Sequence, residues 1–422
     1  MNLHTPGNGL FETHVTWEDI EKDMLRELQT KASFGPRKSA KDLAEGIGFL
    51  SKMLLIDPDW QNADKELPKR FVVKILTQMI VANMTAEMSA IGDSATDYGE
   101  SYKKAHNTEV LVYNYLIKHS HGRVLLPKIY HTKSFTESNP LKGYIIMEYL
   151  GNARADFCSS FDINSVKEVF PTIAAMEAMS LKFTTEERNQ FTTTFYQQFY
   201  GKMCEDNVFV KSIEMLRTLD DGRFNKKVDK LEAYANHMLD PVKVDRLADD
   251  LGMQRVLCHG DLWTGNVLWV KEDNNELKAN AIIDFQCAHL GCPAVDIASM
   301  LLSCLSGKDR QEHWTELLEL FYSNLKEEVG DMKMPYTFEQ LKESYCQCLP
   351  FIGFTFLPFM IPFLDKMRKE NIEENKQKLE SLLERMDYLL DDMISFYKRN
   401  KEKNLQTVTV PGKQFGSSKL AN

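Results

Sequence analysis

Two short apolar runs near the middle of the chain, each joined to an acidic side chain, constrain the fold most. The first is VLCHGDLWTGNVLWV, residues 256–270, which contains Asp261 and Asn266. The second is the apolar run in NAIIDFQ, which ends at Asp284. A turn-prone segment, residues 272–276, lies between the runs, so we expect a hairpin of two strands. Such a hairpin would bring Asp261, Asn266 and Asp284 to one edge.

Three oxygen-bearing side chains at one edge suit Mg²⁺, which takes oxygen ligands and keeps substrate phosphates in its shell. In the template for phosphoryl transfer, one aspartate accepts the proton of the substrate hydroxyl, while an asparagine and a second aspartate hold the metal. By this template Asp261 is the catalytic base, and Asn266 and Asp284 are the metal ligands. The alternative is a structural hairpin with an aspartate turn. The Asp284-Phe285 pair downstream favours the site over that alternative.

The residue before Asp261 separates this loop from the loop of protein kinases. The spacing His259-x-Asp261-x4-Asn266 agrees with the protein-kinase pattern, but Gly260 stands where that pattern has arginine. The arginine can pair with a phosphate on an activation loop. Its replacement by glycine therefore argues against that mode of control, and His259 is expected to brace the loop.

A lone lysine in an apolar strand predicts the other half of the site. Lys74 lies in RFVVKIL, residues 70–76, and a cation in such a run needs a partner. A phosphate is the natural partner, with a helix glutamate to orient the lysine. The best candidate is Glu109, at the start of a helix expected over residues 107–119. The alternative is a surface lysine on an edge strand, with a glutamate favoured by the helix dipole.

Two further segments of the first half are expected to contact a nucleotide. A short turn, with the pattern of a phosphate-covering loop, contains three candidate residues, Gly46, Gly48 and Ser51. A Gly-x-Gly pattern is also common in ordinary hairpin turns, and its position upstream of Lys74 is what favours the nucleotide. Residues 147–150, which include Glu148 and Tyr149, follow another strand. Their backbone is expected to read the adenine.

The order of these segments predicts an α+β chain of two lobes. Residues 1–150 would form a small β-rich N-lobe that binds the nucleotide phosphates. Residues 151–400 would form a larger, mainly helical C-lobe with the catalytic loop, the metal and the substrate. Residues 401–422 read as a polar tail. Ligands often bind in the crevice between two such lobes.

Composition excludes several classes of protein. The chain has 422 residues and a net charge of −10, which is poorly suited to binding a nucleic-acid backbone. Its eight cysteines lack zinc-site spacing, so we expect reduced structural thiols. The N-terminus lacks the pattern of a signal peptide. The strongest apolar run, residues 349–363, contains three prolines and is too short to span a bilayer. We therefore expect a cytoplasmic protein without a membrane span.

The motifs CHGDLWTGNVLW, IIDFQ with GCPAVDIASML, and FVVKI together resemble the CHK kinase-like or ecdysteroid kinase-like family, in its nematode-type branch. This family belongs with the choline kinases and aminoglycoside phosphotransferases in the protein-kinase-like fold. The resemblance runs from about Ser33 to about Tyr397. It implies ATP- and Mg²⁺-dependent phosphorylation of a small-molecule hydroxyl, with Asp261 as base. One departure from protein kinases is Gln286, where they have glycine.

Other functions stay open on the sequence alone. A protein that binds the nucleotide without transfer would keep the same motifs, whereas a protein kinase would carry the arginine before Asp261 and an Ala-Pro-Glu segment. Trp263 and the aromatics of residues 351–363 would line an apolar pocket. Such a pocket favours a sterol-like or lipid-like alcohol or a glycoside over a polycation. The sequence leaves the oligomeric state undetermined.

Overall fold

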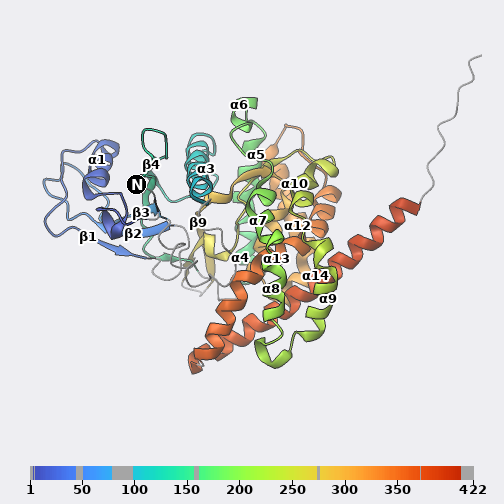
Figure 1. Ribbon diagram of the computed structural model, residues 1–422. Coiled ribbons are helices and arrows are strands. Elements are labelled where there is room, and N and C mark those ends of the chain that lie inside the picture. Colours follow the sequence, from blue (N-terminus) through green and yellow to red (C-terminus); the bar gives the residue numbers. More distant parts are fainter. Residues whose placement is uncertain are drawn as a thin grey trace, which may run out of the picture.

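The computed structural model describes residues 3, 5–43, 51–77, 98–155, 161–272, 276–370 and 372–409. Figure 1 shows a sheet-containing N-lobe beside a larger helical C-lobe, with α3 and β9 between them. This arrangement confirms the predicted α+β class with a β-rich N-lobe and a helical C-lobe. The exact boundaries of the lobes stay predictions.

The N-lobe is built on a five-stranded antiparallel sheet in the order β1-β2-β3-β5-β4. Every residue of the central strand β3 is buried, as expected for its β-branched and aromatic sequence. The elements of this lobe are η1 (Leu10–Glu12), α1 (Trp17–Leu28), β1 (Ser39–Asp42), β2 (Ser51–Asp57), β3 (Phe71–Leu76), α3 (Tyr98–His119), β4 (Ile129–Lys133) and β5 (Tyr144–Glu148).

The two faces of this sheet bury different side chains because successive residues of a strand point to opposite faces. Val73 and Ile146 pair across β3 and β5 and pack with α1. Val72 and Met147 also pair, and they join the core that α3 and the C-lobe share. Lys74 lies on the same face as Val72, so its side chain is directed toward the C-lobe.

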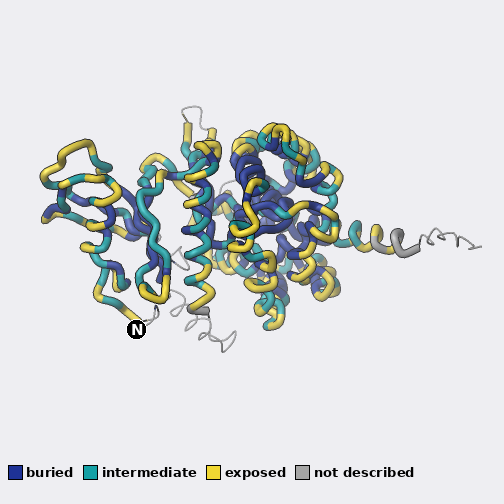
Figure 2. Tube along the Cα trace, turned by 90° about the horizontal axis from the view of Figure 1, so that it is seen from above, coloured by how far each residue is buried: buried dark blue, intermediate teal, exposed yellow. Residues whose placement is uncertain are grey.

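The C-lobe is a bundle of helices with two small antiparallel sheets, and Figure 2 shows its buried interior. Its strands are β6 (Ala153–Arg154), β7 (Val256–Cys258), β8 (Val267–Lys271), β9 (Leu277–Ile282) and β10 (His289–Gly291). Its helices are α4 (Ile163–Lys167), α5 (Phe170–Ser180), α6 (Thr185–Arg188), α7 (Phe195–Glu205), α8 (Val208–Met215), η2 (Leu219–Gly222), α9 (Asn225–Met238), α10 (Pro241–Asp250), η3 (Thr264–Asn266), η4 (Phe285–Cys287), α11 (Ala294–Cys304), α12 (Gly307–Val329), α13 (Phe338–Glu370), η5 (Glu373–Asn375) and α14 (Lys376–Thr409).

Helix α13 contains the apolar run noted in the sequence. Among the described helices it is the one whose length and composition would suffice to cross a membrane, and 56% of its most apolar window is buried inside the protein. It packs between α11 and α14, as a core helix of a globular lobe does. Helix α14 continues to Thr409, so the first nine residues of the predicted tail are helical.

Candidate active site

The predicted hairpin forms from β8 and β9, and the loop before it, which follows β7, has a position that only glycine can occupy. Strand β7 ends at Cys258, and Gly260 then adopts a left-handed φ of +82°. A Cβ at this position would lie 2.1 Å from the carbonyl oxygen of Cys287. The glycine is therefore required by this close approach of backbone. The sequence interpretation, which considered only the missing arginine, had not identified this reason.

The buried carboxylate of Asp296 holds the same loop through its backbone. Asp296, in the first turn of α11, accepts hydrogen bonds from the backbone N–H of His259 at 2.6 Å and of Gly260 at 2.9 Å. The His259 ring lies 3.0 Å from the carbonyl oxygen of Ile283, measured from Nε2. Burial lowers the pKa of His259 to about 4, so this ring is neutral and braces the loop.

Asp261 and Asn266 lie in contact at the end of this loop. The Asn266 Nδ2 donates to the Asp261 backbone carbonyl at 2.7 Å and to its Oδ2 at 3.0 Å. Burial and the nearby Asp284 carboxylate raise the pKa of Asp261 to about 7, although the Asn266 hydrogen bond opposes the rise. A carboxyl with a pKa near the working pH is suited to accept a proton.

Asp284 follows β9 in a left-handed conformation, with φ of 69° and ψ of 61°. Aspartate tolerates this region better than most residues, and the turn brings the carboxylate toward the N-lobe. Its Oδ1 accepts a hydrogen bond from Lys74 Nζ at 2.8 Å, and 36% of its side chain is exposed. The exposed part remains accessible to a ligand.

Lys74 joins the two lobes through a buried group of charges. Its Nζ donates to both carboxylate oxygens of Glu109, at 2.9 and 2.7 Å, and the two side chains are 5% and 0% exposed. Burial alone would lower the pKa of Lys74, but the carboxylates of Asp284 and Glu109 raise it above its usual value. The lysine therefore keeps its charge in a buried position.

The prediction that Glu109 lies at the start of its helix is wrong. Helix α3 begins at Tyr98, so Glu109 lies three turns inside it, and the helix dipole does not explain its presence there. The alternative of a surface lysine on an edge strand is also wrong, because β3 is central and Lys74 is buried. Asp261, Asn266, Asp284, Lys74 and Glu109 thus meet at one place.

The other predicted residues lie at different places. Gly46 and Gly48 fall outside the described residues. Ser51 is the first residue of β2, and its hydroxyl accepts a hydrogen bond from Gln286 Nε2 at 3.4 Å. Glu148 pairs with Phe71 in the sheet, so its side chain is on the α1 side, whereas Lys74 is on the opposite face.

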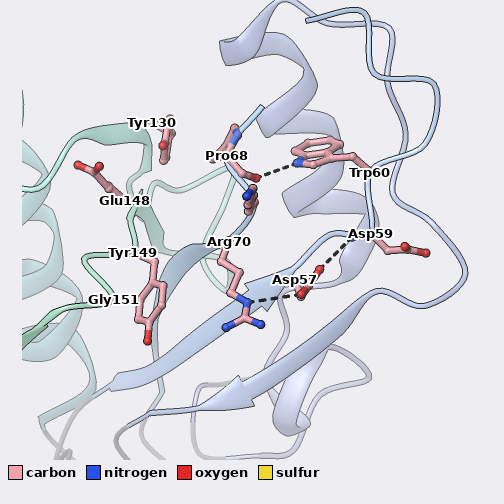
Figure 3. A pocket seen from close by; sticks show the side chains of 10 residues that line it. Asp57, Asp59, Trp60, Pro68, Arg70, Tyr130, Glu148, Tyr149 and Gly151 are labelled. Atoms are coloured by element: carbon pink, nitrogen blue, oxygen red, sulfur yellow. Dashed lines mark hydrogen bonds and ion pairs between the residues drawn. The ribbon is translucent and has the colours of Figure 1, made fainter. Parts of the chain in front are cut away.

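Figure 3 shows a cavity of about 740 Å³ on this outer side of the linker after β5. Glu148 and Tyr149 line it together with the β2–β3 connection, where Arg70 lies 3.5 Å from Asp57. The cavity contains none of the residues around Lys74. Any contact of this linker with adenine would therefore involve its backbone and the side chain of Met147, which shares a face with Val72.

Sequence reasoning missed some residues that hold the site. Gln286 was noted only as a departure from protein kinases, although it contacts Ser51. Phe285 places its ring edge-on to Tyr113 at 5.3 Å, which packs the loop against α3. The alternation of side chains along β5 could have indicated that Met147 lies on the face directed toward the C-lobe. No local sequence signal indicated the contact of Gln286 with Ser51.

Comparison with known proteins finds one matching family model and two similar proteins of Caenorhabditis elegans. A family model, DUF1679, described as "Uncharacterized oxidoreductase dhs-27", matches residues 3–401. The "Uncharacterized kinase-like protein D1044.1" of Caenorhabditis elegans is 27% identical over 282 residues, 64% of this chain and 70% of that protein. The "Uncharacterized oxidoreductase dhs-27" of the same organism is 23% identical over 228 residues, 52% of this chain but 27% of that protein.

Two solved structures are similar at a lower level. The choline kinase from Cryptosporidium parvum is 13% identical with a TM-score of 0.45, over 88% of this chain and 91% of that one. A GDP complex of wild-type aminoglycoside 2'-phosphotransferase-IIIa is 13% identical with a TM-score of 0.41, over 89% and 97%. The resemblance to the nematode-type kinase-like branch is confirmed by the family model and the kinase-like relative. Since the family model matches almost the whole chain, this protein belongs to the DUF1679 family.

Proposed function

We propose that the protein is an ATP-dependent phosphotransferase that acts on a hydroxyl group of a small molecule. The observation that supports this most is the meeting of a buried, charged lysine from the N-lobe with the Asp284 carboxylate of the C-lobe. Asp261 and Asn266 lie on the loop that leads into β8, and β8 pairs with β9, which precedes Asp284. These are the residue types that phosphoryl transfer requires.

Each side chain has a role that its environment supports. Asp261 would accept the proton of the attacking hydroxyl, because its raised pKa makes it a base near neutral pH. Lys74, held by Glu109, would bind the phosphates as a fixed cation. The clamp of Asp296 on the backbone of His259 and Gly260 would keep Asp261 in place during the reaction.

The side chains also suit a magnesium ion. Asn266 directs its N–H₂ group toward Asp261, which leaves its amide oxygen as a possible ligand, and Asp284 is partly exposed. Carboxylate and amide oxygens are the ligands that Mg²⁺ prefers. When bound with ATP, the ion would neutralise charge on the transferred phosphoryl group.

The surroundings of Asp261 support an apolar acceptor. Burial, and then the Asp261 carboxylate, raise the pKa of Tyr200 well above its usual value, although Thr355 of α13 opposes the rise. Tyr200 also packs edge-on against Phe351 at 6.0 Å. Aromatic side chains from α7 and α13 therefore stand beside the proposed base. A sterol-like or lipid-like alcohol, or a glycoside, would fit such a wall better than a polycation.

The description of the family mentions an oxidoreductase, but little in this structure supports an oxidoreductase activity. That name is given to a relative of which the match covers 27%, so its chemistry can reside in the remainder. Dinucleotide-binding oxidoreductases of the Rossmann type use a parallel sheet. The strand pairs in the described part of this chain are antiparallel.

We further propose that the protein works in the cytoplasm. The seven cysteines that the structure describes are free thiols, and five of them are buried, which fits a reducing compartment. Neither the acidic composition nor the site suggests a nucleic-acid partner.

The function is tested by ATP consumption with purified protein against fractionated lipid and metabolite extracts. The wild type should consume ATP in the presence of one fraction, and Asp261→Asn, which keeps the shape of the side chain, should lose about 10²–10⁴-fold of that rate. A thermal shift with Mg·ATP is measured beside it for both proteins. Consumption that survives in Asp261→Asn would refute the proposed base.

The same pair of measurements distinguishes a nucleotide-binding protein without transfer activity. Such a protein would show the thermal shift with Mg·ATP and no turnover with any fraction. Absence of both the shift and the turnover in the wild type would refute the proposal as a whole.

A further inference from the structure

Gln286 occupies a buried position between three elements that the proposed reaction uses. It follows Asp284 by two residues, in η4, and only 8% of it is exposed. Phe285 buries its ring against Tyr113 of α3. The next side chain, that of Gln286, lies against the start of β2 in the N-lobe, where it contacts Ser51.

The carboxamide of Gln286 faces two polar side chains of the N-lobe. Its Nε2 donates to the hydroxyl of Ser51 at 3.4 Å, and Ser51 is 7% exposed. Its side chain also lies close enough to the carboxylate of Glu109 to lower the pKa of Glu109. A glutamine has two N–H donors, so it can serve both acceptors. One side chain thereby connects β2, α3 and the loop that carries Asp284.

The chemistry of these contacts requires a neutral donor of this length. Glu109 is fully buried and already receives two hydrogen bonds from Lys74. A glutamate in place of Gln286 would add a third carboxylate beside Glu109 and Asp284, and a methionine would leave the Ser51 hydroxyl without its donor. A buried polar group that loses its partner is destabilised.

We propose that Gln286 is a positioning residue that fixes the start of β2 relative to the Lys74–Glu109–Asp284 group. This inference rests on the proposed function and deepens it. Ser51 begins the strand whose Met53 pairs directly with Lys74. The position of Ser51 therefore sets how β2 lies over the lysine, and with it the space for the nucleotide phosphates. Gln286 acts on ATP binding through Ser51 and Glu109, without touching the acceptor.

The test compares Gln286→Met, Ser51→Ala and the double variant, with kcat and the KM for ATP and for the acceptor measured separately. In Gln286→Met the KM for ATP should rise about tenfold, as expected for the loss of a buried hydrogen bond of about 1.4 kcal/mol. The KM for the acceptor should stay unchanged. The double variant should be no worse than Gln286→Met, because both substitutions remove the same contact. Ser51→Thr, which keeps the hydroxyl, should raise the KM for ATP less than Ser51→Ala does.

Gln347→Met is the matched control. Gln347 is half-buried in α13 and donates to Glu343 at 2.9 Å, so this variant removes the same kind of bond at a place away from the site. It should leave the KM for ATP unchanged. Thermal unfolding without nucleotide, measured for every variant, identifies any general loss of structure.

Two outcomes would overturn the inference while the proposed function stands. One is ATP turnover by the wild type together with a KM for ATP that is unchanged in Gln286→Met. The other is a double variant in which the two effects on KM multiply. Calorimetric titration of the wild type with Mg·ATP separates these outcomes from failure of the proposed function, which would show neither binding nor turnover.

Discussion

Removal of Lys74 should destabilise the protein in a way that depends on pH. Lys74→Met keeps the length and apolar stem of the side chain but leaves Glu109, which is 0% exposed, without the cation that lies at 2.7 Å. Breaking a buried ion pair by removal of one partner costs about 3–5 kcal/mol. Asp284 loses the same partner, but 36% of its side chain is exposed, so water can compensate it.

The pH dependence follows from the direction of the shift at Glu109. Burial raises the pKa of Glu109 from 4.5 to about 7, and Lys74 opposes this rise. Without Lys74 the pKa in the folded state rises further. A carboxyl with a raised pKa in the folded state costs stability as the pH rises above its unfolded value. In the wild type this cost levels off above pH 7, where Glu109 is ionised. In Lys74→Met the cost continues, so above pH 7 the free energy of unfolding should fall by about 1.4 kcal/mol per pH unit relative to the wild type.

Urea unfolding followed by circular dichroism at pH 7, 7.5, 8 and 8.5 measures this difference. The double variant Lys74→Met/Glu109→Gln removes the charge that Lys74 balanced. It should recover most of the lost stability and show little difference in slope from the wild type. Phosphotransfer should stay absent in both variants, so stability and activity separate. A pH-independent loss in Lys74→Met, or a double variant as unstable as the single one, would refute the reasoning.

Three other substitutions test the loop of Asp261 and the C-lobe that carries it. Gly260→Ala should lower both kcat and the unfolding temperature, because its Cβ would lie 2.1 Å from the Cys287 oxygen at a φ that itself costs about 1–2 kcal/mol; unchanged kcat and melting would contradict this. Glu177→Gln should raise the free energy of unfolding at pH 7.5 by about 1–3 kcal/mol. Burial raises the pKa of Glu177 well above its usual value, and the Tyr336 hydroxyl, which donates to Glu177 Oε2 at 2.5 Å, would keep an acceptor in the glutamine. In melting experiments the gain should shrink toward pH 5. Glu343→Gln should lower the free energy of unfolding by about 1–2 kcal/mol at pH 7. Burial raises the pKa of Glu343, but two cations of α14 outweigh this effect and lower the pKa to about 2. The difference from the wild type should fade as the pH falls from 4.5 toward 2.

The proximity of the proposed base and metal ligands was predictable because their segments are neighbours in the sequence. Asp261 and Asn266 are five residues apart on a loop, and Asp284 lies two residues after β9, which pairs directly with β8. Short antiparallel strands bring such residues together with little help from the rest of the fold. The burial of Lys74 was also predictable, since its strand is apolar on both sides.

The long-range contacts that hold this loop and hairpin in place were not predictable from local pattern. Asp296 contacts the backbone 36 and 37 positions earlier, and Gln286 contacts Ser51 across 235 positions. Contacts at such separations depend on the tertiary fold. The start of α3 was missed for another reason. Its first two turns are polar and charged, so helical periodicity becomes visible only near Val110.

The two halves of the site are held by different kinds of interaction, so they should respond differently to a movement of the N-lobe. The loop that carries Asp261 is fixed inside the C-lobe by backbone hydrogen bonds to Asp296 and by the glycine contact with Cys287. Lys74 is fixed by charges that reach across from β3 and α3 to Asp284. Movement of the N-lobe would therefore shift Lys74 relative to Asp284 while Asp261 and Asn266 keep their contact. Because Gln286 belongs to the C-lobe and contacts the N-lobe at Ser51, it connects the two parts beside the Lys74–Asp284 pair.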